Sequence, residues 1–226
     1  MIFESSLNRD SEVSSDEFEA LMEEVGPFES SPHIAVGCSG GADSLALVFL
    51  LDKWTKVNGG RVTALIVDHG IRDESCNEAI TVKSWLAEKG LESEILFANL
   101  TRSIPSLQSV ARYERYRLMG DWCRERGVLH LCMGHQKEDQ AETLILNLMR
   151  GSGIDGLASM APIVERESCR ILRPLLSVSK SRLIACLRSE SQTFVKDPSN
   201  EDMAFKRVRI RALMPEFARE GGNIER

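Results

Sequence analysis

The chain has 226 residues, a formal net charge of −6 at pH 7, 42% hydrophobic residues and 27% charged residues. This length suffices for one large domain with a core of its own, and the composition is that of an ordinary globular protein rather than a disordered one. The longest apolar run, Leu45–Leu51, has seven residues, whereas a membrane-spanning helix needs about 20. These values exclude the transmembrane and collagen-like classes.

The sequence predicts a cytoplasmic protein with reduced thiols. Its first twenty residues contain neither a basic start nor an apolar stretch, so no secretory signal is predicted. The six cysteines are spaced by nine residues or more and form no CxxC pair: Cys38, Cys76, Cys123, Cys132, Cys169 and Cys186. We therefore expect no disulfide, no zinc site and no iron–sulfur cluster.

Charge is distributed unevenly along the chain. Residues 1–30 contain nine acids and one base, and we expect this acidic leader to be flexible and separate from the domain. Residues 166–211 contain eleven bases and five acids. Such a basic stretch either faces a polyanionic partner or is simply a solvated helix surface.

The hydrophobic pattern alternates between short apolar runs, typical of buried strands, and longer segments with helical spacing. A helix is predicted over 16–25, ended by Gly26-Pro27. The expected strands are 33–38, 62–67, 94–98, 128–133 and 169–172, and the expected helices are 45–54, 76–89, 110–126, 138–150, 179–189 and one from about 204. This alternation predicts an α/β fold: a parallel sheet with helices on both faces.

Ligands bind at the carboxyl ends of the strands in such sheets. Here those ends are the segments 39–41, 68–70 and 134–135. Residues 39–41 begin the segment Ser39-Gly40-Gly41-Ala42-Asp43-Ser44, which lies between a predicted strand and a predicted helix. Its glycines, hydroxyls and helix N-terminus suit a phosphate group, and an acid in that position suggests a shared Mg²⁺. The segment is neither GxxxxGK[ST] nor GxGxxG.

SGGADS resembles the pyrophosphatase-type loop, or PP-loop, of enzymes that cleave ATP to AMP and pyrophosphate. Other segments resemble, in order, motifs of the tRNA(Ile)-lysidine synthetases. They are VDHGIR at 67–72, ARYERYR at 111–117, GHQKEDQAETLILNLMRGSG at 134–153, LRPLL at 172–176, and DPSN at 197–200 followed by Arg207, Arg209 and Arg211. The resemblance covers about residues 33–215.

This resemblance implies a Rossmann-like PP-loop catalytic domain over 31–215, with the fold of the adenine nucleotide alpha hydrolases. It also implies ATP and Mg²⁺ as cofactors, and free L-lysine and a CAU-anticodon tRNA(Ile) as partners. ATP would adenylate the wobble cytidine, and the ε-amine of lysine would then displace AMP to give lysidine. Many members carry further C-terminal domains that contact tRNA; we expect these to be absent here, with 216–226 as a tail.

The resemblance also assigns roles to single residues. The expected nucleotide-binding residues are Ser39, Gly40, Gly41, Ala42, Asp43, Ser44, Asp68 and His69, with Asp43 as metal ligand. The expected catalytic residues are Asp43, His135, Asp139, Glu142 and Arg112, and the expected RNA or substrate contacts are Arg115, Arg207, Arg209 and Arg211. Which acid binds metal and which accepts a proton from the amine is left open. Each residue also has a simpler structural interpretation, such as a helix cap or a surface ion pair.

The motifs depart from the family pattern at three positions. Gln136 and Glu138 stand where the pattern has His and Asp, and Val208 stands where it has Asn. Two other functions remain open: a nucleotide- or tRNA-binding fragment without full activity, and another PP-loop tRNA-modifying enzyme such as a thiolase. Thiolases of that kind usually carry cysteine pairs, which this sequence lacks.

Overall fold

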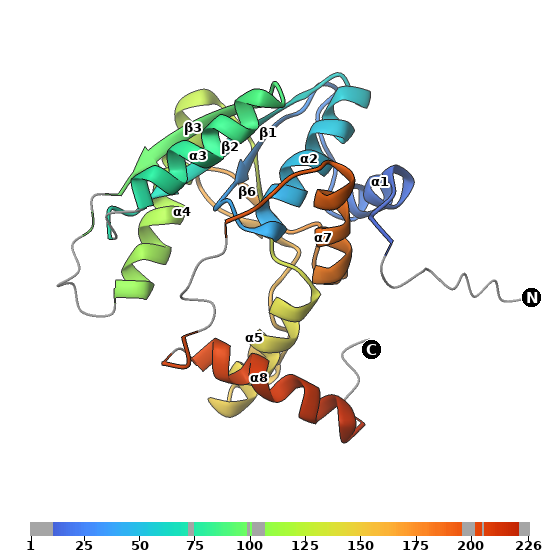
Figure 1. Ribbon diagram of the computed structural model, residues 1–226, viewed down its shortest axis with the longest axis vertical. Coiled ribbons are helices and arrows are strands. Elements are labelled where there is room, and N and C mark those ends of the chain that lie inside the picture. The colour runs from blue at the N-terminus through green and yellow to red at the C-terminus, as the bar shows by residue number, and fades with distance from the viewer. Residues whose placement is uncertain are drawn as a thin grey trace, which may run out of the picture.

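Figure 1 shows the computed structural model of the chain. It describes residues 11–71, 75–98, 100, 107–195, 202–204 and 206–221. Arg72 and the DPSN segment at 197–200 lie outside the described residues.

The centre of the fold is a six-stranded sheet with the order β3-β2-β1-β4-β6-β5. The strands are β1 (His33–Gly37), β2 (Arg61–Asp68), β3 (Glu92–Phe97), β4 (His130–Met133), β5 (Ile163–Glu165) and β6 (Arg170–Leu172). All neighbours pair in parallel except β5, which runs antiparallel to β6 at the edge. The parallel sheet predicted from the sequence is confirmed; the three-residue edge strand β5 was not predicted.

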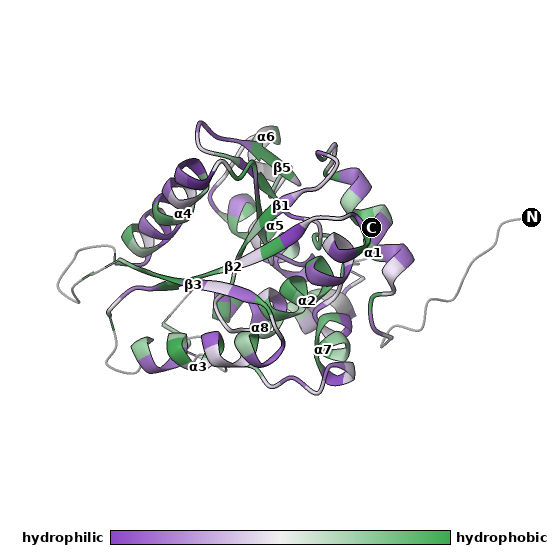
Figure 2. Cartoon of the chain, turned by 90° about the horizontal axis from the view of Figure 1, so that it is seen from above, coloured by the Kyte–Doolittle hydropathy of each residue, from purple (hydrophilic) through white to green (hydrophobic). Residues whose placement is uncertain are grey.

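Helices cover both faces of this sheet, as Figure 2 shows from above. The helices are α1 (Ser15–Glu24), α2 (Ala42–Val57), α3 (Ser75–Glu88), α4 (Leu107–Arg126), α5 (Lys137–Met149), α6 (Ile154–Leu157), α7 (Lys180–Ser189) and α8 (Lys206–Arg219). One core cluster joins α1, α2, α3 and α7 to one face, with buried residues such as Ile34, Leu47 and Leu183. A second cluster joins α4 to the other face through residues such as Met119 and Leu131.

α5 lies beyond the carboxyl edge of the sheet. It begins four residues after β4 ends, and α8 packs against it in the lower part of Figure 1. The residues that follow β1 and β4 therefore face α5 and α8 across a common cavity.

The N-terminal segment differs from the separate leader expected from its charge. From Val13 onward it contributes buried side chains to the main core, with Phe18 2% and Met22 0% exposed. Arg182 of α7 also donates a hydrogen bond of 2.6 Å to the carboxylate of Glu17. The physical reason is the apolar stripe of α1, which needs a partner surface and finds it on α2. Residues 13–25 are thus part of the domain.

The structure also bears on the expected state of the cysteines and on membrane-spanning helices. All six cysteines are free thiols, and only Cys76 is exposed. Among the described residues, no helix is both long enough and apolar enough to cross a membrane.

Candidate active site

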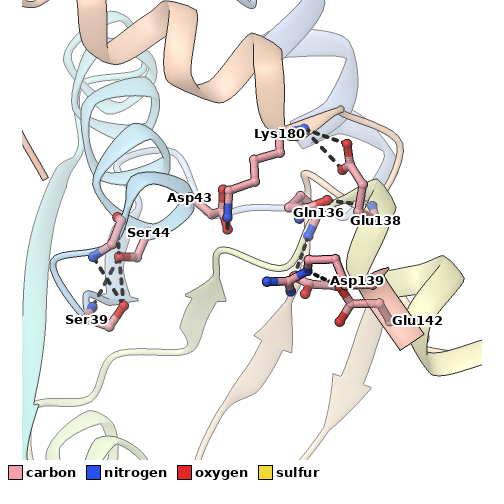
Figure 3. Close-up of polar contacts among 10 residues, drawn as sticks. Ser39, Asp43, Ser44, Gln136, Glu138, Asp139, Glu142 and Lys180 are labelled. Atoms are coloured by element: carbon pink, nitrogen blue, oxygen red, sulfur yellow. Dashed lines mark hydrogen bonds and ion pairs between the residues drawn. The ribbon is translucent and has the colours of Figure 1, made fainter. Parts of the chain in front are cut away.

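The segment after β1 forms a tight turn at the N-terminus of α2. The backbone N–H of Ser39 donates to Ser44 Oγ at 3.2 Å, and Ser44 Oγ donates to the carbonyl of Gly41 at 3.0 Å (Figure 3). Gly40 has φ +80°, and a Cβ there would lie 2.4 Å from Val82 Cγ2, so only glycine fits. The turn is held closed around the helix N-terminus, where an anion binds most favourably.

The end of β4 lies directly against the first turn of α2. A Cβ on Gly134 would lie 3.0 Å from the carbonyl carbon and oxygen of Asp43 and from the Cα of Ser44. The absence of a side chain at Gly134 therefore sets how closely β4, and α5 behind it, approach the turn.

Asp43 points from α2 toward α5 and α7 (Figure 3). Its Oδ2 lies 3.5 Å from Lys180 Nζ, and its Oδ1 is buried with no hydrogen-bond partner. Burial raises the pKa of Asp43 above its ordinary value; the cation of Lys180 opposes this shift, and the carboxylates of Asp139 and Glu138 add to it. One carboxylate oxygen of Asp43 therefore has no partner, and two other carboxylates lie nearby. A bound cation would stabilise the charged form of Asp43.

The two unusual residues in the α5 motif have structural roles. The side chain of Gln136 accepts the Glu138 N–H, while Asp139 Oδ2 accepts the Gln136 N–H at 3.2 Å, which makes a capping box. Both carboxylate oxygens of Glu138 accept the backbone N–H of Lys180, at 3.1 and 3.2 Å. Gln136 therefore caps α5, and Glu138 caps α7 and positions Lys180 beside Asp43.

Glu142, one turn further along α5, is a buried carboxylate, 1% exposed. Its Oε1 accepts a hydrogen bond of 2.7 Å from Arg211 Nε of α8. Its Oε2 is buried without a partner. Because an unpaired buried carboxylate oxygen is costly, this atom is ready to accept a donor from a ligand.

Two adjoining cavities meet at the turn. The inner cavity, of about 470 Å³, lies between the ends of β1 and β2 and helices α3 and α4. It is lined by apolar residues, by His69, Arg115 and His135, and by polar and acidic residues that include Asp68 and Glu78. The outer cavity, of about 1010 Å³, lies between α2, α4, α5, α7 and α8, and its lining includes two acids and six basic residues. Ser39, Ser44 and Gly134 line both cavities.

The histidines of the inner cavity are neutral at physiological pH. Burial lowers the pKa of His135 to about 3, and the neighbouring cations of Arg173, Arg112, Arg115 and Arg207 add to that shift. Burial and the Arg115 guanidinium likewise lower the pKa of His69. Both rings can therefore donate or accept hydrogen bonds but carry no charge.

Asp68 holds the turn after β2. Its Oδ1 accepts the Gly70 N–H at 2.9 Å and the Ser75 hydroxyl at 2.6 Å. It lines the inner cavity as expected from the sequence, but these bonds engage it in ordering the chain before α3.

The predicted arginines separate into three environments. Arg112, Arg207 and Arg211 line the outer cavity, and Arg207 donates to Thr143 Oγ1 at 3.1 Å. Arg115 lines the inner cavity instead. Arg209 is exposed on α8 and donates to backbone carbonyls of the preceding turn at 2.6 and 2.8 Å; it is not among the described residues that line either cavity.

Sequence reasoning did not single out three further cations at the outer cavity. Lys180, Arg150 and Lys206 all line it. Lys180 and Lys206 lie in the basic stretch 166–211, and Arg150 lies in the motif that ends α5. Their positive charge is visible in the sequence. Only the packing of α5, α7 and α8 brings these cations to the cavity that Asp43 also lines.

Comparison with known proteins adds to this geometry. A family described as the PP-loop domain matches residues 11–217. The chain belongs to this family. The match begins ahead of α1, in agreement with the packing of that helix into the domain.

The sequence is also similar to curated tRNA(Ile)-lysidine synthases. Identity is 44% over 199 residues for the protein from Bradyrhizobium sp. strain BTAi1, covering 87% of this chain and 56% of the relative. For Bradyrhizobium diazoefficiens it is 41% over 215 residues, covering 94% and 59%, and for Orientia tsutsugamushi 36% over 193 residues, covering 85% and 44%. The resemblance inferred from the motifs is confirmed, and the chain spans about half the length of these relatives.

A solved structure shows the same fold in another enzyme. It is the U34-tRNA thiolase NcsA from Methanococcus maripaludis with its [4Fe-4S] cluster. The TM-score is 0.76 at 17% sequence identity, covering 92% of this chain and 74% of the thiolase chain. At this identity the likeness concerns the fold alone.

Proposed function

We propose that the chain carries out the lysidine synthetase reaction on a CAU-anticodon tRNA(Ile), with ATP and free L-lysine as the other substrates. ATP adenylates the carbonyl oxygen of the wobble cytosine, and the ε-amine of lysine then displaces AMP. The observation that carries this proposal is that a PP-loop turn, Asp43 and Arg211 line one cavity, with Arg211 bonded to Glu142. Asp43 and Glu142 each have one buried oxygen without a hydrogen-bond partner. Similarity to lysidine synthases over 85–94% of the chain supports it.

The turn at Ser39–Ser44 suits the pyrophosphate leaving group. The hydroxyls of Ser39 and Ser44 lie 3.2 Å apart, and together with backbone N–H groups at the start of α2 they can donate to a phosphate bound at the turn. The ammonium group of Lys180 lies on the other side of Asp43. Together they stabilise the negative charge that develops as the bond to the α-phosphate breaks.

Asp43 and Asp139 fit a magnesium ion shared with the phosphates. Mg²⁺ commonly uses one or two carboxylates together with phosphate oxygens, and Asp43 Oδ1 is a buried oxygen without a partner. Magnesium bound there would supply positive charge against the leaving pyrophosphate. Among the described residues no cluster of three or more metal-ligating side chains occurs, as expected for an ion held largely by its substrate.

Glu142 suits the amine of lysine. Its Oε2 can accept a hydrogen bond from the ε-ammonium group and take up the proton that the amine must lose before it attacks. Arg211 holds the other oxygen, so the carboxylate has a fixed orientation. Arg207, Arg209 and Arg211 on α8 would contact the polynucleotide, in which case Arg211 couples RNA binding to the position of Glu142.

Thiolase chemistry is favoured less. The similar thiolase carries an iron–sulfur cluster, whereas five of the six cysteines here are buried as free thiols and no three metal-ligating side chains gather within the described residues. Free thiols also agree with a reducing compartment, so the cytoplasm is part of the proposal.

The test is incorporation of radiolabelled lysine into an unmodified CAU-anticodon tRNA(Ile) transcript, with ATP and Mg²⁺. We expect label in the RNA from the wild-type chain and from Asp52→Asn, which alters an outward-facing residue of α2 that pairs with Lys56. We expect none from Asp43→Asn. ATP binding without any incorporation by the wild-type chain would identify a binding fragment instead, and absence of ATP binding would refute the nucleotide site itself.

A further inference from the structure

Arg115 of α4 is a half-buried cation without an anionic partner among the described residues. Its Nε is buried and has no hydrogen-bond partner, and within the described part of the chain it forms no ion pair with a carboxylate. Its guanidinium lies 5.7 Å from the ring centre of Tyr116. Burial lowers the pKa of Arg115, and the nearby cations Arg112 and Arg207 lower it further.

Such an arrangement is unfavourable in the empty protein. A buried arginine is normally satisfied by a carboxylate or by several carbonyls, because removing its charge from water costs several kcal/mol. Arg117, two residues along the same helix, shows the usual pattern: it binds Glu114 at 2.8 Å and Asp121 at 2.9 Å. Among the described residues Arg115 has no such partner, which indicates that an anion from outside completes its environment.

Two more buried polar atoms without a hydrogen-bond partner belong to residues that line the same cavity. The Nδ1 atoms of His69 and His135 are buried without hydrogen-bond partners, and both residues line the inner cavity together with Arg115. The inner cavity is thus lined by the Arg115 cation, two neutral rings and the acids Asp68 and Glu78, of which Asp68 already accepts hydrogen bonds from Gly70 and Ser75. Arg115 and the two rings can together bind the oxygens of one anionic group.

The position of the inner cavity indicates which anionic group binds Arg115. It meets the outer cavity at Ser39, Ser44 and Gly134, where the proposed function places the pyrophosphate. At about 470 Å³ the inner cavity is large enough for an adenosine moiety. The α-phosphate, which joins the two parts of ATP, would then lie between the turn and Arg115.

We propose that Arg115 binds the α-phosphate of the nucleotide, with the rings of His69 and His135 as additional donors, and so retains the adenylyl group after pyrophosphate has left. The inference rests on the proposed function. It narrows the role of Arg115, which the sequence motif had assigned to RNA or substrate contact, to the nucleotide.

The reaction gives this residue a role in each step. In the first, the cytosine carbonyl oxygen bonds to the α-phosphorus, and the bond to the bridging oxygen breaks, with the electron pair leaving on pyrophosphate. In the second, the lysine nitrogen bonds to the cytosine carbon and gives up a proton to Glu142, while the carbon–oxygen bond breaks and its electron pair leaves on AMP. The α-phosphate changes from a singly charged diester to a monoester with up to two charges, so a fixed guanidinium favours this departure.

Binding measurements test the inference apart from turnover. Calorimetric titrations with AMP, adenosine and inorganic pyrophosphate would compare the wild-type chain with Arg115→Met, Arg115→Lys and the matched control Arg117→Met. We expect Arg115→Met to weaken AMP binding about 10- to 100-fold, with adenosine and pyrophosphate affinities changed less than about twofold. Arg115→Lys should keep part of the AMP affinity, and Arg117→Met all of it.

Two results would overturn the inference. One is AMP affinity of Arg115→Met equal to that of the wild-type chain; the other is an equal loss of adenosine affinity, which would mean that Arg115 only shapes the cavity. If either is found while the wild-type chain still incorporates lysine into tRNA, the inference fails and the proposed function stands. A wild-type chain that binds neither ATP nor AMP would refute both.

Discussion

Replacement of Gly134 by alanine tests the geometry on which the whole site depends. The added methyl carbon would lie 3.0 Å from three backbone atoms of Asp43 and Ser44, below the 3.4–4 Å of ordinary contact. Backbone cannot rotate away as a flexible side chain can, so β4 or the first turn of α2 must move by a few tenths of an ångström. Overpacking of this kind destabilises a protein by about 1–3 kcal/mol. For a chain of this size that lowers Tm by about 2–12 °C.

The same displacement should weaken nucleotide binding. It separates the hydroxyl of Ser44 and the carboxylate of Asp43 from the position that the phosphates require, and we expect a loss of ATP affinity on the order of tenfold. Thermal unfolding followed by circular dichroism and ATP titration by calorimetry measure the two effects. Gly153→Ala is the control, because Gly153 has φ −69° and no atom lies within 4 Å of its Cβ position; it should change stability by less than about 1 kcal/mol.

An unchanged Tm together with unchanged ATP affinity in Gly134→Ala would refute the close approach of β4 to α2. A lower Tm with wild-type ATP affinity would show that the strain is relieved away from the turn, and that the turn does not depend on β4 for its position.

Three further predictions concern the core, the histidines and the basic helix. Phe18→Ala, in α1, should lower the free energy of unfolding by about 3–5 kcal/mol in urea denaturation, because the side chain is 2% exposed; a change below about 1 kcal/mol would mean that α1 is dispensable. The pKa of His135 falls from its ordinary 6.5 to about 3 in the folded chain, so its contribution to stability is complete above pH 6.5. That contribution is lost as the pH falls toward 3, with a slope of up to about 1.4 kcal/mol per pH unit; His135→Asn should remove it, and an unchanged slope would contradict a buried neutral ring. Arg209→Ala should weaken tRNA binding and make the logarithmic salt dependence shallower by about one unit, whereas an identical slope would assign Arg209 only to the turn whose carbonyls it binds.

Much of the architecture was predictable because it depends on local sequence. The continuous apolar runs at 33–38 and 62–67 can only be strands buried on both faces, and the structure has strands at β1 and β2. The turn at Ser39–Ser44 was equally predictable, since a glycine pair between strand and helix leaves few backbone conformations. The acids Asp139 and Glu142 of α5 were recognised through the resemblance of their segment to the family motif.

Other features depend on contacts that the linear sequence does not display. The charge of residues 1–30 suggested a separate leader, but the apolar face of α1 meets α2 and determines where the segment lies. The short strand β5 has too few residues for a pattern, and it exists because β6 offers an edge.

What the sequence by itself determined is the order of strands and helices, the turn that suits phosphate and the set of charged residues at the strand ends. Only the tertiary structure decided which partner each charge has. Glu138 caps α7, Arg209 binds the turn before its own helix, and Arg115 lines the inner cavity with His69 and His135. The physical reason is that burial and partner choice are properties of the packed space between elements. The same guanidinium or carboxylate is a surface charge, a helix cap or a ligand-binding group according to which distant segment folds against it.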